Sequence, residues 1–195
     1  MPDFRLKIDT HPRMKPDSRM NIILFSGYIG SGKSFAAEQL HKLIPNSQII
    51  AFGTKVKDGT ATLYNIPRNL CETQEGKLTI ILDYGMTVRD LLIQYSADMK
   101  YTHGNDVWAN IVAENIRNTP HITTWIINDW RYPNELEVLH KAFPDAKLQT
   151  VRIHRNTVQP KTFPSEHALD NYPFNHNITN DDTAEELINN LASLI

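Results

Sequence analysis

Short apolar runs alternate along the chain with longer segments in which apolar residues recur every three or four positions. Runs of the first kind predict buried strands, and segments of the second kind predict helices that pack by one face. Because strands that alternate with helices usually form a parallel sheet, we expect an α/β fold, a doubly wound parallel sheet of about five strands with helices on both faces. The expected strands are 21–26, 47–52, 124–129, 148–153 and 177–179, and the expected helices are 35–43, 55–64, 87–99, 106–118, 133–142 and 183–194.

The sequence gives weaker indications of structure for the segments between these elements. Residues 65–77 are polar and carry Pro67 and Gly76, so they are expected to form a loop. Residues 78–82 are apolar and fit either a strand or a buried connector. Residues 155–174 are polar and contain prolines, which indicates a long loop. Thr87 and Asp106 precede two predicted helices, where their side chains are suited to cap them.

Composition limits the class of protein. The chain has 195 residues, 41% hydrophobic and 22% charged, which is ordinary for a globular protein with one main domain. Its net charge of −2 argues against stable nucleic-acid binding, and its single cysteine excludes an intramolecular disulfide. No apolar run approaches the ~20 residues of a membrane span, and no signal peptide is visible, so a cytoplasmic protein is expected. We expect residues 1–19 to be an N-terminal extension and residues 20–195 to form the domain.

The clearest chemical motif has the form G-x-x-x-x-G-K-[ST] and lies between the first predicted strand and a predicted helix. In such a loop, backbone N–H groups cradle the phosphates of a nucleotide, the lysine reaches the β- and γ-phosphates, and the hydroxyl is suited to bind magnesium. A chance match is the alternative, but the order of strand, loop and helix favours phosphate binding. The sequence therefore predicts an ATP and magnesium site at Gly27, Tyr28, Ile29, Gly30, Ser31, Gly32, Lys33 and Ser34.

Further polar residues follow later strands, and ligands of such sheets bind at the carboxyl ends of the strands. Asp129 and Arg131 come after the most apolar strand, where Asp129 could hold magnesium and Arg131 could reach a phosphate. The alternative is a helix-capping Asp beside a surface Arg. Arg155 stands at the root of the 155–174 loop and could neutralise the phosphoryl group in transfer, or be a solvated surface residue. Arg152 alternates with apolar neighbours and is expected to face outward.

A second group of residues lies between the second strand and Asp129, where the acceptor of a phosphate would need partners. Lys57 and Arg89 stand near the starts of predicted helices, and arginine is suited to bidentate phosphate contacts. Asp106 could contact a sugar or a base. Trp108 could stack on a base, or be a core aromatic residue instead.

With these residues in view, the chain from about residue 20 onward resembles the deoxynucleoside monophosphate kinases of tailed bacteriophages, in the P-loop kinase superfamily. The similar stretches, besides the phosphate loop, are F-G-T-K-V-K at 52–57, T-V-R-D-L-L at 87–92, D-V-W at 106–108, D-W-R-Y-P-N-E at 129–135, and Ser165-Glu166 with Leu169. The chain departs from the family at Gly53, where alanine is usual, and at Ser96-Ala97, where Gly-Thr is common.

The resemblance implies transfer of the γ-phosphate of ATP to a deoxynucleoside monophosphate, in a host cytoplasm if the protein is phage-encoded. It implies a monophosphate-binding helical region at about 53–118 and a mobile lid at about 155–174. It further implies that Arg89 and Arg131 hold the acceptor phosphate, and that Asp106, Trp108 and Glu166 belong to the substrate site.

We therefore expect Lys33, Arg131, Arg155 and magnesium to neutralise the charge that develops during transfer. Two alternatives stay open at this point. One is another small-molecule P-loop kinase, such as a phosphomevalonate or dephospho-coenzyme A kinase, and the other is a nucleotide-binding regulatory protein without enzymatic activity. The oligomeric state, monomer or homodimer, is also open.

Overall fold

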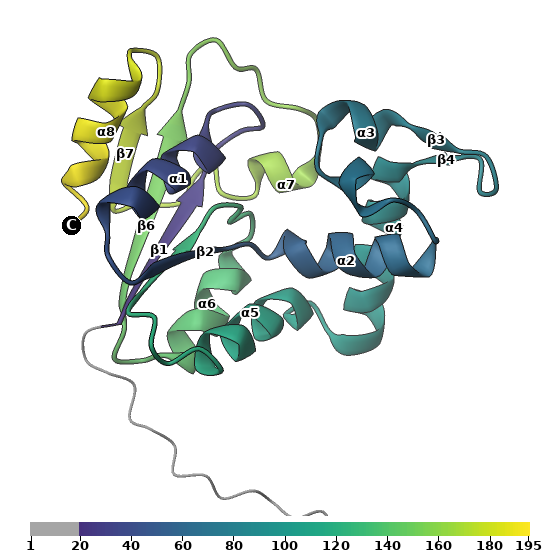
Figure 1. Ribbon diagram of the computed structural model, residues 1–195, viewed down its shortest axis with the longest axis horizontal. Helices are drawn as coiled ribbons and strands as arrows, with labels where there is room; N and C mark the ends of the chain where they lie inside the picture. Colours follow the sequence, from purple (N-terminus) through teal and green to yellow (C-terminus); the bar gives the residue numbers. More distant parts are fainter. Residues whose placement is uncertain (1–19) are drawn as a thin grey trace, which may run out of the picture.

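The computed structural model describes residues 20–195, so the predicted extension at residues 1–19 lies outside the described residues. Its centre is a five-stranded sheet in the order β2-β5-β1-β6-β7, in which every neighbouring pair is parallel (Figure 1). This confirms the predicted α/β fold with a doubly wound parallel sheet. The strands are β1 (Asn21–Ser26), β2 (Ser47–Ile50), β5 (Thr124–Ile127), β6 (Lys147–His154) and β7 (His176–Thr179).

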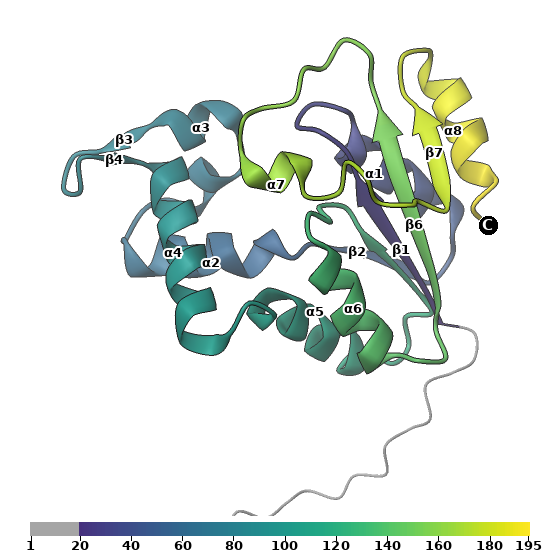
Figure 2. The ribbon, with the colours of Figure 1, turned by 180° about the vertical axis from the view of Figure 1, so that it is seen from behind.

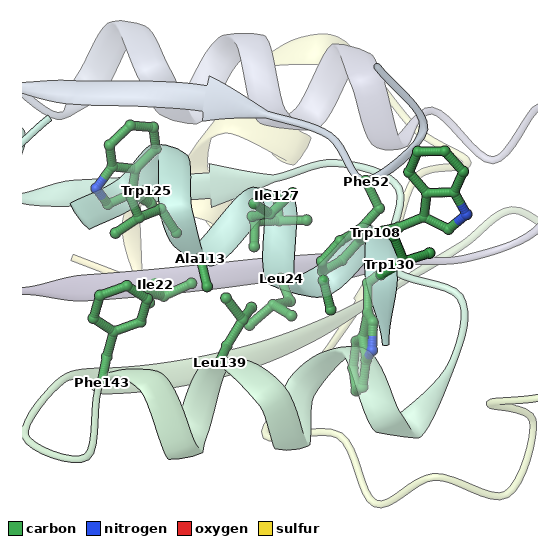
Figure 3. Close-up of a cluster of buried hydrophobic side chains, with 14 of the residues drawn as sticks. Ile22, Leu24, Phe52, Trp108, Ala113, Trp125, Ile127, Trp130, Leu139 and Phe143 are labelled. Carbon is green, nitrogen blue, oxygen red and sulfur yellow. The ribbon is translucent and has the colours of Figure 1, made fainter. Parts of the chain in front are cut away.

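Helices cover both faces of the sheet, and the alternation along β1 shows why both faces are apolar. Ile22 and Leu24 pack in a core with residues of α5 (Val107–Arg117) and α6 (Pro133–Ala142), as Figure 3 shows for Ala113 and Leu139. The neighbours of Ile22 and Leu24 along the strand join a second core beneath α1 (Lys33–Leu43) and α8 (Ala184–Ala192). Successive side chains of a strand point to opposite faces, so a strand covered on both sides is continuously apolar.

A smaller helical region extends from one side of the sheet, as both views of the ribbon show (Figures 1 and 2). It has its own cluster of buried side chains around Val88 and Leu91, which includes Cys71. The elements of this region are α2 (Gly53–Leu63), the 3₁₀ helix η1 (Arg68–Cys71), α3 (Gln74–Leu78), β3 (Ile80–Ile81), β4 (Met86–Thr87) and α4 (Val88–His103).

Two predictions about the connecting segments were wrong in part, and for the segment 78–82 the strand is the correct alternative. Residues 65–77 contain η1 and most of α3, because Thr73 caps α3 by accepting from the N–H of Gly76. The apolar segment 78–82 holds the short strand β3 in a hairpin but is not buried, since Leu82 is 90% exposed. The polar loop 155–174 contains the short helix α7 (Pro164–His167), which has proline at its start.

Helix boundaries agree with the sequence where capping residues define them. Helix α6 begins and ends at the predicted residues, and Glu135 closes a capping box at its first turn. Thr87 caps α4, but the side chain of Asp106, at the N-cap position of α5, makes no capping bond, so that prediction was wrong. Across residues 20–195, no helix combines the length and apolar character needed to cross a bilayer.

The cap of α4 generates a test of stability. Thr87 Oγ1 accepts from the N–H of Asp90 at 3.2 Å, and the carboxylate of Asp90 accepts from the N–H of Thr87 at 3.2 Å. We predict that Thr87→Ala lowers the free energy of unfolding by about 1 kcal/mol, whereas Thr87→Ser retains most of it, because serine caps as well as threonine. Denaturant titrations of the two variants measure this difference, and equal losses would contradict the cap's contribution.

Candidate active site

The predicted phosphate loop connects β1 to α1, with Lys33 as the first residue of the helix. Gly30 and Gly32 have φ values of 88° and 96°, a conformation that side chains other than glycine rarely adopt. A Cβ on Gly32 would also clash with Nδ2 of Asn180, whose amide group donates to the carbonyl of Ser31 at 2.9 Å. The loop is therefore held in shape by a residue that follows β7, far away in the sequence.

Lys33 is buried, and its ammonium group donates to the carbonyl of Tyr28 at 2.8 Å. Burial, and next the nearby positive charge of Arg131, together lower the pKa of Lys33 to about 7. A bound polyphosphate would supply the anion that favours the charged lysine. Ser34, the next residue, is exposed at the start of α1.

Asp129 holds the start of α2. One carboxylate oxygen accepts from the N–H of Phe52 and the other from the N–H of Gly53, each at 2.8 Å. Burial raises the pKa of Asp129, and these two N–H groups oppose the rise. A Cβ on Gly53 would lie 3.1 Å from the same carboxylate, so a larger side chain here would require the carboxylate to shift by a few tenths of an ångström. Asp129 therefore caps a helix, as the alternative interpretation expected, and the helix that it caps is α2. Magnesium binding by Asp129 stays a prediction.

The protein oxygen atoms available at this site fit a magnesium ion that binds together with a nucleotide. Among residues 20–195, no group of three or more His, Cys, Asp or Glu side chains is placed to hold a metal ion. Magnesium in kinase sites is usually bound by one or two protein oxygens, substrate phosphates and water, rather than by a protein cage. Ser34 could supply such an oxygen directly, and Asp129 could do so through water.

Arg131 connects the phosphate loop to the segment after β5. Its Nη1 donates to the carbonyl of Gly27 at 3.1 Å and to the carboxylate of Glu166. The backbone of this segment is fixed by Glu135, whose Oε2 accepts from the N–H groups of Arg131 and Tyr132, both at 2.9 Å. Arg131 is thus half-buried rather than a free surface residue, since Nη1 contacts the phosphate loop through Gly27 and the 155–174 segment through Glu166.

Arg152 is a correction to the sequence analysis, because it is 5% exposed and does not face outward. Its guanidinium donates to Ser26 Oγ at 3.1 Å and to Asp170 at 2.9 Å, and lies 4.7 Å from the ring centre of Tyr28. The physical reason is that both faces of the sheet are covered. A polar residue that alternates with apolar ones on such a strand points into the protein.

The predicted acceptor residues are only partly brought together. Arg89 donates to Gln74 at 2.7 Å and lies 5.5 Å from the ring centre of Phe163, so it joins the helical region to the 155–174 segment. Lys57 is paired with Glu72 at 2.6 Å. Asp106 accepts from Asn134 Nδ2 at 2.8 Å. Arg155 is exposed at the end of β6.

A cavity of about 390 Å³ lies between α2, α4, α5 and the segment after β5. Its walls carry aromatic side chains, including buried Trp108, whose indole N–H donates to Ser96 at 3.0 Å. Trp108 is therefore both a core residue and a wall of the cavity, and Figure 3 places it beside Phe52 at one end of the core. The cavity is lined by Phe52, Trp108 and Tyr132, by the charged Lys100, Arg131, Asp129 and Glu135, and by Ser165 of the 155–174 segment, among others.

Sequence reasoning missed four residues of this site. Asn180 supports the phosphate loop, Asp170 binds Arg152 and the hydroxyl of Tyr28, and Lys100 lines the cavity and lies over the ring of Tyr132. Glu135 was part of a motif but had no role assigned. Besides Glu135, Lys100 carried a sequence signal, since it lies on the same face of its helix as Ser96 and Leu92, at a spacing of four.

Comparison with known proteins adds only distant similarities. No protein-family model matches the chain, and no curated protein matches it. An APS kinase of Mycobacterium tuberculosis in complex with AMPPNP and APS is 11% identical, with 90% of this chain and 97% of that chain covered and a TM-score of 0.47.

A sugar kinase from Janibacter sp. HTCC2649 is 15% identical, with 89% and 93% covered and a TM-score of 0.45. The tunicamycin resistance protein of Deinococcus radiodurans is 12% identical, with 90% and 96% covered and a TM-score of 0.48. Function is therefore inferred from the side chains of the chain itself.

Glu135 generates a pH prediction, because burial raises its pKa to about 7. Between the ordinary pKa of a glutamate and about pH 7, Glu135 is still protonated in the folded state but already ionised in the unfolded state. The contribution of Glu135 to the free energy of unfolding therefore falls as pH rises through this window. We predict that Glu135→Gln gains stability relative to the wild type between pH 5 and pH 8.

Denaturant unfolding at several pH values measures this gain, with the exposed Glu137→Gln on the same helix as the control. A difference between Glu135→Gln and the wild type that does not vary with pH, or that shrinks as pH rises, would contradict the assignment.

Proposed function

We propose that the chain is a P-loop phosphotransferase that transfers the γ-phosphate of ATP to a nucleoside monophosphate, giving ADP and the nucleoside diphosphate. The observation that carries this proposal is the position of Arg131. One arginine bonds to the carbonyl of Gly27 in the phosphate loop and lines the adjoining cavity. A donor phosphate and an acceptor phosphate that both lie near Arg131 would meet at the distance that phosphoryl transfer needs.

The reaction needs alignment and charge neutralisation rather than a covalent intermediate. The N–H groups of the phosphate loop and Lys33 would bind the donor phosphates, and Arg131 would contact the phosphate that is transferred or accepted. Magnesium, when bound, would supply additional positive charge, and Ser34 and, through water, Asp129 would hold it. Arg155 would add its charge if the lid, residues 155–174, carries it inward over the donor, which would also exclude water.

The shape and walls of the cavity favour a nucleotide as the acceptor. Its volume of about 390 Å³ lies within the usual range for small-molecule sites. Phe52, Trp108 and Tyr132 give it flat aromatic surfaces on which a base can stack, and Arg89 stands at the start of α4, which lines it. A flexible aliphatic phosphate acceptor, as in phosphomevalonate kinases, would make little use of these walls. The preference for a deoxyribonucleotide rests on the resemblance to the phage enzymes.

A regulatory protein that only binds a nucleotide is the weaker alternative. Such a protein needs the phosphate loop but has no use for a second cavity with cationic side chains beside it. Arg131 and Lys100 both line that cavity. Positively charged residues next to a donor site are what an acceptor phosphate requires.

The direct test is a coupled ADP-release assay with ATP and magnesium and a panel of acceptors. The panel contains dAMP, dCMP, dGMP, dTMP, the ribonucleotides, phosphomevalonate and dephospho-coenzyme A. We predict turnover with at least one nucleoside monophosphate. Lys33→Ala should lose at least about 100-fold in kcat, since removal of a single preorganised charge typically costs that much, while its circular dichroism spectrum and Tm show that it still folds.

The outcomes separate the alternatives. Turnover only with a non-nucleotide acceptor would keep the donor site and overturn the nucleotide assignment. ATP binding without turnover of any acceptor would favour the regulatory protein. Unchanged turnover in Lys33→Ala would contradict the proposed role of the phosphate loop.

A further inference from the structure

The most buried carboxylate of the lid is that of Glu166, which is 2% exposed. It stands in α7, which both ribbon views place between the phosphate loop and the helical region (Figures 1 and 2). Burying a carboxylate is costly unless hydrogen bonds and opposite charges compensate it. The contacts of Glu166 therefore indicate what this part of the lid is built to do.

The two carboxylate oxygens of Glu166 bind two different parts of the site. Oε2 accepts from the N–H of Ile29 in the phosphate loop at 2.8 Å. Oε1 accepts from Nη1 of Arg131, the arginine that lines the cavity. The side chain of Glu166 thus connects Ile29 of the phosphate loop to Arg131, which lie 102 positions apart in the sequence (131 − 29).

The contacts of Arg131 show what this link fixes. Nη1 donates both to Glu166 and to the carbonyl of Gly27, and within residues 20–195 the guanidinium makes its described hydrogen bonds through this one nitrogen. The planar guanidinium is therefore anchored at one corner, which leaves Nη2 and Nε for a bidentate contact with a phosphate. The positive charge of Arg131 lies close enough to Lys33 to lower its pKa, so an anion between the loop and Arg131 also reduces the repulsion between them.

We propose that Glu166 is a positioning residue that orients Arg131 toward the acceptor phosphate and ties the lid to the phosphate loop. This proposal rests on the proposed function of Arg131, and it deepens that function by assigning Glu166 a role other than substrate contact. Glu166 acts through Arg131, so its removal affects acceptor use more than ATP binding. Small displacements of a group that orients a reacting phosphate cost up to about 100-fold in rate.

The test is a double-mutant cycle with Glu166→Gln and Arg131→Ala, with the exposed Glu38→Gln on α1 as the matched control. The coupled assay gives kcat and KM for the acceptor, and calorimetry gives the Kd of ATP. We expect Glu166→Gln to lower kcat/KM for the acceptor by about 10- to 100-fold, with the Kd of ATP changed by less than about threefold. In the Arg131→Ala background the same substitution should have little further effect, because the residue through which it acts is gone.

A second readout does not depend on any acceptor. Lys161 is exposed in the lid, so trypsin can cut after it when the lid loosens. We expect faster cleavage after Lys161 in Glu166→Gln than in the wild type and in Glu38→Gln. If no acceptor is turned over, the proposed function fails, and the cleavage rates still decide whether Glu166 holds the lid on the phosphate loop.

Three results would overturn the inference. Additive effects of the two substitutions on kcat/KM would show that Glu166 does not act through Arg131. Tighter ATP binding or faster turnover in Glu166→Gln would show that the carboxylate competes with phosphate instead. Cleavage after Lys161 at the wild-type rate would show that Glu166 does not hold the lid.

Discussion

The concentration of positive charge at the carboxyl ends of β1, β5 and β6 is the constraint on which the site depends. Lys33, Arg131 and Arg152 follow or end these strands, and two of the three are buried. Cations in such surroundings need partners. Lys33 donates to the carbonyl of Tyr28, and the 155–174 segment supplies carboxylates to the two arginines. Glu166 pairs with Arg131 and Asp170 pairs with Arg152. The 155–174 segment is therefore attached to the sheet by charge as well as by packing, and the proposed polyphosphate would enter a place already arranged for anions.

The same strand ends join the two halves of the site. Asp129 follows β5 and fixes the start of α2, so the cavity wall formed by α2 is positioned by the sheet. Arg131, two residues later, returns to the phosphate loop. These three residues thus position a wall of the proposed acceptor cavity and also contact the phosphate loop. This explains how the small helical region keeps its position relative to a loop that is far from it in the sequence.

Much of the fold could be predicted from local sequence patterns. The contacts between segments far apart in the sequence could not. The phosphate loop and α6 follow from glycine, capping and periodicity signals that operate within a few residues, so their places were predicted correctly. The prediction that Arg152 faces outward was wrong because the alternation of polar and apolar residues distinguishes the two faces of a strand but does not indicate whether helices cover each face. The bonds of Asp129 to α2 and of Asn180 to the phosphate loop join distant segments, and no local signal marks them. For residues 78–82 hydrophobicity left a strand and a buried connector open, and exposed Leu82 shows that the buried connector is not formed.

The central claim is that donor and acceptor phosphates bind next to each other across Arg131. The most direct test is the affinity for a bisubstrate compound, adenosine joined through a polyphosphate chain to the nucleoside of the preferred acceptor. If the two sites adjoin, calorimetry should give a Kd at least about 100-fold below that of ATP, because the second half binds as part of the same molecule. An affinity no better than that of ATP would contradict the account, since it would mean that the cavity and the phosphate loop do not form one site.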